Sequence, residues 1–174
     1  VTKILDRAGQ KGTGKWTGIS ALHAGVPLTL IVESVFARSV SSQKEERIAA
    51  SKVFDFKPSA PVADTKAFIE ALRSALYAAK IISYAQGFSL IKTTGEENTW
   101  DLNLGGIALL WRGGCIIRSA FLDKISQAFS SDPALKNLIL DPYFSSILTK
   151  THQQLRQVVA AAALNGIPAP SLSA

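Results

Sequence analysis

Apolar residues recur every three or four positions over most of the chain, which is the spacing of one face of an α-helix. The clearest early example lies between Gly18 and Phe54, where Pro27 marks a boundary. Its apolar positions predict one wide helix face, formed by Leu28, Ile31, Val32, Val35, Phe36 and Val40.

Downstream, aspartates predict where helices begin. Asp64 is placed to cap a long helix that runs to about Thr93. Asp132-Pro133 and Asp141-Pro142 each put a capping carboxylate before a first-turn proline, so each predicts a helix start. The last of these helices should end at Asn165-Gly166, a strong stop signal.

Glycines predict the breaks between the remaining helices. A break is expected over residues 94–98, and Gly105-Gly106 interrupts the next apolar stretch. Paired glycines between Arg112 and Arg118 predict a tight turn, followed by a helix over 119–129. Because no β-strand alternation is sustained, the sequence predicts a single all-α domain over residues 1–174, without solenoid repeats.

Composition narrows the classes of partner. With 47% apolar residues, the 174-residue chain can bury a core, and its net charge of +6 suits an anionic partner. The basic residues are dispersed instead of forming the stripe typical of nucleic-acid binders, so no nucleic-acid partner is expected. No apolar run reaches the ~18 residues that a membrane helix needs.

Cysteine and histidine usage argues against metal and disulfide chemistry. Cys115 is the only cysteine, which excludes an internal disulfide framework and a cysteine-rich zinc site. Its apolar neighbours predict a buried structural thiol. His23 and His152 belong to no metal-binding pattern. No metal is expected, and a reducing, cytoplasmic setting fits the chain best.

The most informative segment is Gly9-Gln-Lys-Gly-Thr-Gly-Lys-Trp-Thr17. Its glycines let backbone amides approach a ligand, and Lys11, Thr13 and Lys15 add the cations and hydroxyl that bind phosphate or carboxylate. A solvated turn without a ligand remains an alternative. So does a nucleotide P-loop, although Trp16 stands where Ser or Thr should bind magnesium.

Arg38 is the second candidate for anion binding. It follows Phe36 and Ala37 on the first apolar helix, where a guanidinium could clamp a phosphate through two hydrogen bonds. It could equally extend into solvent or pair with a nearby acid.

Four runs, taken in order, resemble the C-terminal helical domain of the 6-phosphogluconate dehydrogenases, and the resemblance covers essentially the whole chain. They are the loop at 8–17, Val35-Phe-Ala-Arg-Ser39, Ala79-Lys-Ile-Ile-Ser-Tyr-Ala-Gln-Gly-Phe88 and Leu104-Gly-Gly-Ile-Ala-Leu-Leu-Trp-Arg-Gly-Gly-Cys-Ile-Ile-Arg-Ser119.

This family uses NADP to oxidise and decarboxylate 6-phosphogluconate to ribulose 5-phosphate, in the pentose phosphate pathway and gluconate utilization. The resemblance implies a homodimer in which Lys11 and Thr13 contact the substrate and Arg38 binds its phosphate. Whether Lys15 does so is left open.

The resemblance also implies what residues 1–174 lack. No Gly-x-Gly-x-x-Gly unit of a Rossmann domain is present, so NADP should bind elsewhere in the intact enzyme. The family's catalytic lysine and glutamate and its C-terminal tail are expected outside this segment, which should be inactive alone. A non-catalytic helical dimerisation module is the alternative function.

Overall fold

The computed structural model describes residues 3–54, 57 and 62–174, and within these ranges every regular element is helical. The helices are α1 (Thr13–His23), α2 (Thr29–Ser42), α3 (Lys44–Val53), α4 (Thr65–Glu97), α5 (Leu104–Leu110), α6 (Leu122–Ser131), α7 (Pro142–Leu164) and α8 (Pro170–Ser173), with a 3₁₀ turn η1 at Leu138–Leu140. The all-α prediction is confirmed.

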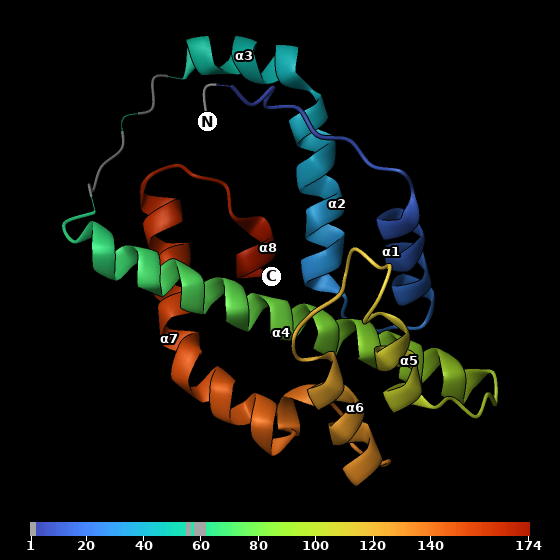
Figure 1. Ribbon diagram of the computed structural model, residues 1–174. Coiled ribbons are helices and arrows are strands. Elements are labelled where there is room, and N and C mark those ends of the chain that lie inside the picture. Colours follow the sequence, from blue (N-terminus) through green and yellow to red (C-terminus); the bar gives the residue numbers. More distant parts are fainter. Residues whose placement is uncertain (1–2, 55–56, 58–61) are drawn as a thin grey trace.

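Helix α4 organises the molecule, running across its middle with α1, α2 and α3 on one side and α6 and the first part of α7 on the other (Figure 1). Its buried positions are mostly small, which lets neighbouring helices approach closely. They include Ala71, Ala75, Ala78, Ala79 and Ala85. Helix α7 packs against α4 more extensively than any other two elements pack against each other within the described residues, so the two longest helices form the frame of the domain.

The main core fills the space between α4, α6, η1 and α7. Ile81, Leu122 and Phe144 are completely buried there. Phe121 lies between Tyr84 and Phe144, with its ring edge-on to each at centroid distances of 5.2 and 5.9 Å. Such tilted aromatic pairs add packing energy beyond the area that they bury.

Helix ends follow the predicted capping chemistry at two aspartates. The Asp64 side chain accepts a hydrogen bond from the Ala67 amide at 2.9 Å, and Asp141 accepts from the amides of Tyr143 and Phe144. At the far end of α7, Gly166 adopts a left-handed φ of 62°, as expected for a glycine that ends a helix.

Several predicted boundaries are wrong. Gly105 and Gly106 lie inside α5, and the helix expected over residues 119–129 begins at Leu122. Helix α4 continues through residues 94–97, and Gly95 serves packing there, since a Cβ would lie 2.5 Å from Leu102 Cδ1. Asp132-Pro133 starts no helix. The Asp132 carboxylate accepts from the Ala134 amide, but this caps only a turn before η1.

Helices α2 and α3 are poorly buried. Neither contains a buried residue, and Phe36 and Val40 on the predicted apolar face of α2 are exposed. The start of α2 is nevertheless fixed to α4, since Gln86 accepts from the Leu30 amide and donates to Thr29. Helix α3 lies at the opposite end of α2, away from α4 (Figure 1).

Candidate functional site

The candidate site begins where the glycine-rich segment turns into α1. Gly12 has a φ of 100°, a left-handed conformation that favours glycine, and it immediately precedes the helix. Its carbonyl accepts the first helical hydrogen bond, from the Trp16 amide at 2.9 Å. Helix α1 therefore begins at Thr13, and residues 13–17, expected to belong to a loop, are helical.

No side chain caps this end of α1. The first amides of a helix have no partner within the helix and carry the positive end of its dipole, so they favour an anion. Lys11 lies directly before this end and is exposed, as are Thr13 and Lys15. Together these residues surround the start of α1 with hydrogen-bond donors.

Arg38 reaches this segment from α2. Its Nε donates to the Gly9 carbonyl oxygen at 2.5 Å, so the guanidinium lies against the backbone of the glycine-rich segment. Among the described residues, its two terminal nitrogens make no hydrogen bond or ion pair. One edge of the guanidinium thus holds the loop, while the other can bind a phosphate.

Two glycines of α1 lie against α2. A Cβ on Gly14 would lie 2.8 Å from Val35 Cγ2, and one on Gly18 would lie 3.1 Å from Val32 Cγ2. Both glycines therefore let α1 pack closely on α2. Gly14 therefore has a packing role that its place in the glycine-rich motif did not predict, and it also lines the pocket described below.

The P-loop alternative lacks its structural context. A P-loop connects a buried strand to a helix, whereas residues 3–12 form irregular and turn structure before α1. Trp16, which stands where the motif needs Ser or Thr, is 65% exposed. The segment is instead an irregular lead into a helix, held from the side by Arg38.

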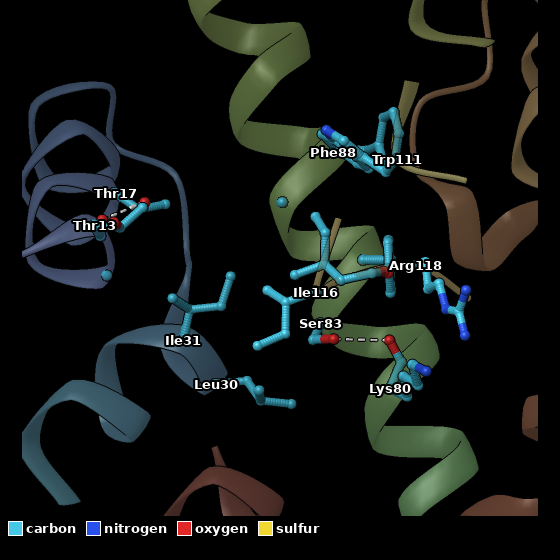
Figure 2. A pocket seen from close by; sticks show the side chains of 14 residues that line it. Thr13, Thr17, Leu30, Ile31, Lys80, Ser83, Phe88, Trp111, Ile116 and Arg118 are labelled. Atoms are coloured by element: carbon cyan, nitrogen blue, oxygen red, sulfur yellow. Dashed lines mark hydrogen bonds between the residues drawn. The ribbon is translucent and has the colours of Figure 1, made fainter. Parts of the chain in front are cut away.

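A pocket of about 570 Å³ opens beside the start of α1 (Figure 2). Its walls are mainly apolar side chains, and Thr13 is the only one of the three predicted substrate contacts on them. Lys11 and Arg38 lie outside this lining. The lining residues come from four parts of the chain: Thr13, Gly14 and Thr17; Leu30 and Ile31; Lys80, Ser83, Tyr84, Gly87 and Phe88; and Trp111, Ile116, Ile117 and Arg118.

Two cationic side chains on this pocket were not predicted from the sequence as site residues. Lys80 and Arg118 line it and also border a smaller polar cavity of about 400 Å³. Lys80 lies on α4, and Figure 2 places both side chains at one end of the pocket, away from Thr13. Both lie in runs that carry the family resemblance, but neither was predicted as a site residue, because the two meet only when the turn after α5 folds onto α4.

That turn is fixed by Tyr84, whose hydroxyl donates to the Ile117 carbonyl. Burial raises the pKa of Tyr84, and the nearby Cys115 thiol raises it further, so this hydroxyl keeps its proton as a donor. Cys115 itself is partly exposed, and the expectation of a buried thiol is wrong.

Within the described ranges, no group of three or more His, Cys, Asp or Glu side chains could hold a metal ion. The helices in those ranges are all too short or too polar to cross a membrane.

Comparison with known proteins agrees along the whole chain. The family model of the 6-phosphogluconate dehydrogenase C-terminal domain matches residues 1–174. The decarboxylating 6-phosphogluconate dehydrogenase of Staphylococcus aureus is 54% identical over 173 residues, which cover 99% of this chain and 37% of that protein. Its Staphylococcus epidermidis counterpart is also 54% identical, over 174 residues.

A solved structure shares the fold. It is the Plasmodium falciparum 6-phosphogluconate dehydrogenase, studied as apo enzyme and with NADP+ or 6-phosphogluconate. It matches with a TM-score of 0.92 and 43% identity, over 99% of this chain and 37% of that one. The chain therefore spans little more than a third of the length of its relatives.

Proposed function

The chain belongs to the 6-phosphogluconate dehydrogenase family, and from this premise we propose that it forms the substrate-binding and dimer-forming domain of such an enzyme. The intact enzyme would oxidise 6-phosphogluconate with NADP and release carbon dioxide to give ribulose 5-phosphate. Its setting would be the cytoplasm, in the pentose phosphate pathway and gluconate utilization.

The observation that carries this proposal is the contact between Arg38 and the Gly9 carbonyl. It joins a guanidinium on α2 to the segment that bears Lys11, although the two residues are far apart in sequence. A sugar acid phosphate carries an anion at each end and hydroxyls between them. A guanidinium, an ammonium and the uncapped start of α1 supply matching donors.

Each residue has a distinct proposed role. The terminal nitrogens of Arg38 would bind the phosphate in a bidentate manner. Lys11 and Thr13 would bind the hydroxyl and carboxylate part of the ligand, and orient it for groups outside residues 1–174. These residues bind and position the substrate, while proton and hydride transfer belong to the rest of the enzyme.

NADP would bind outside the described residues. A dinucleotide site of the Rossmann type needs a strand, a glycine turn and a helix, and the described residues contain no strand. Residues 1–174 alone should therefore bind substrate without turning it over.

A homodimer is supported by the apolar side chains left exposed on α2 and α3. Phe36 and Val40 on α2, and Val53 at the end of α3, are each more than half exposed. An apolar face on two projecting helices is typical of a surface that another subunit covers. Sedimentation velocity should give a dimer. A monomer that still binds substrate would remove dimerisation from the proposal.

Thermal unfolding with added ligand tests the substrate. A ligand present at 100 times its Kd stabilises the folded state by about 2.7 kcal/mol. We expect 6-phosphogluconate to raise the Tm of the wild-type chain and to have little effect on Arg38→Ala. ATP at equal concentration should stabilise neither. Stabilisation by ATP alone would replace the proposal with nucleotide binding.

A further inference from the structure

Lys11 lies in a two-residue segment between Gly9 and Gly12, both of which are held in place. On one side, Gly9 is held by Arg38, and on the other, Gly12 begins α1. Only Gln10 and Lys11 lie between them. The position of Lys11 relative to Arg38 therefore depends on these two points and on the contacts that hold the residues before Gly9 in place.

Those residues, 5–9, lie along the junction of α2 and α3 and are called here the anchor segment. Its backbone is bound at several points by side chains of the two helices. The Ala8 amide donates to Ser41 Oγ at 3.1 Å, and Lys44 Nζ donates to the Leu5 carbonyl. At the surface, Arg7 pairs with Glu45 at 3.7 Å.

Arg47 on α3 makes the most extensive of these contacts. Its Nη1 donates to the Asp6 carboxylate at 3.1 Å, and its Nη2 donates to the Asp6 carbonyl at 2.7 Å. The same Nη2 donates to the Ser41 carbonyl in the last turn of α2, at 3.0 Å. One guanidinium thus joins the anchor segment, α2 and α3.

Two further observations indicate that Arg47 and Asp6 are held firmly at this junction. Its Nε is buried and has no hydrogen-bond partner within the described residues, so the group is partly removed from water. Asp6 has a φ of 54°, in the left-handed region that residues other than glycine rarely adopt. Such a conformation persists only where surrounding contacts hold it.

We infer that Arg47, acting through Asp6, is a positioning residue for the sugar-phosphate site. It fixes the anchor segment on the α2–α3 junction, and the anchor segment places Lys11 opposite Arg38. Arg47 itself would not touch the ligand. This inference rests on the proposed function, and it predicts that an ion pair outside the site controls substrate affinity.

The test uses the full-length enzyme that contains this chain. Arg47→Ala should raise the KM for 6-phosphogluconate about tenfold and change kcat less than about twofold, because the reacting groups are untouched. Arg47→Lys keeps one donor to Asp6 and should give a rise of about threefold. The matched control is Arg73→Ala, since Arg73 is exposed on α4 and its one ion pair among the described residues is with Glu70 in the same helix, at 3.7 Å.

The possible results distinguish failure of the proposed function from failure of the positioning role of Arg47. If the wild-type enzyme does not bind 6-phosphogluconate, the proposed function fails. If the wild-type enzyme binds 6-phosphogluconate but Arg47→Ala and Arg73→Ala have the same KM, the positioning role is wrong. This holds even if the Tm of Arg47→Ala falls. A loss confined to kcat also contradicts it.

Should Arg47→Ala fail to fold, Asp6→Ala decides the matter. This change removes the carboxylate partner but leaves the bonds from Arg47 to the two backbone carbonyls. A severalfold rise in KM then supports the inference, and an unchanged KM overturns it.

Discussion

Replacing Gly14 by alanine tests the close packing of α1, which carries Thr13, on α2, which carries Arg38. The added Cβ would lie 2.8 Å from Cγ2 of Val35, closer than real contacts of this kind. Val35 is on α2, three residues before Arg38. Helix α1 must therefore move away from α2, or Val35 must shift, and either change displaces one part of the site from the other.

The magnitude follows from two opposing effects. Overpacking of a closely packed contact costs about 1–3 kcal/mol. Alanine in a helix gains up to about 1 kcal/mol over glycine. The net loss should be about 1–2 kcal/mol, which lowers the Tm of a chain of this size by about 2–8 °C.

Thermal unfolding of four proteins measures this effect: wild type, Gly14→Ala, Val35→Ala and the double variant. Val35→Ala removes the clashing methyl, so the double variant should be at least ~0.5 kcal/mol more stable than the sum of the single changes predicts. The matched control is Gly87→Ala in α4, where a Cβ meets nothing within 4 Å and helix stability should rise. An additive double variant, or a Gly14→Ala chain as stable as wild type, would refute the packing role.

Three further predictions concern the helical frame and the division of the chemistry. Burial and a hydrogen bond with Tyr143 raise the pKa of Tyr77 to about 12. The folded state therefore holds this proton longer than the unfolded state, and the contribution to stability is complete below pH ~10 and lost as the pH rises toward 12. Chemical denaturation across this range should show a stability loss in wild type that Tyr77→Phe lacks; equal pH dependence in both would contradict it. Asp141→Ala removes the cap of α7 and should cost about 1 kcal/mol in the free energy of unfolding by urea, whereas an unchanged midpoint would show that the cap is dispensable. Residues 1–174, incubated with NADP and 6-phosphogluconate, should form no NADPH, and turnover above background would show that the chain holds chemistry assigned here to the rest of the enzyme.

Much of the helical frame could be predicted, because its signals are local. A carboxylate at Asp64 or Asp141 caps the amides two or three residues ahead, and Asn165-Gly166 ends α7 within the same turn. Local signals do not predict a glycine's place in a helix where its packing partner is distant in sequence or follows the helix. Gly95 lies inside α4 with Leu102 packed against it, and Gly14 lies inside α1 with Val35 packed against it.

The candidate site also contains residues that a local motif predicts and residues that only long-range contacts bring together. Lys11, Thr13 and Arg38 were predicted from a glycine-rich motif and a family resemblance, and as ligand contacts they remain predictions. The structure adds that Arg38 holds the Gly9 carbonyl. The role of Arg47 could not be foreseen, since its partner Asp6 is 41 residues away and no motif links them. The same holds for Lys80 and Arg118, which share a pocket only in the folded chain.

The most direct test of the sugar-phosphate site is a crystal structure of the full-length enzyme containing this chain, with 6-phosphogluconate bound. The account predicts the phosphate within hydrogen-bonding distance of the terminal nitrogens of Arg38, and Lys11 Nζ on the hydroxyl and carboxylate part of the ligand. A ligand seated elsewhere, for example in the apolar pocket beside Trp111, with Arg38 bound only to Gly9, would contradict it.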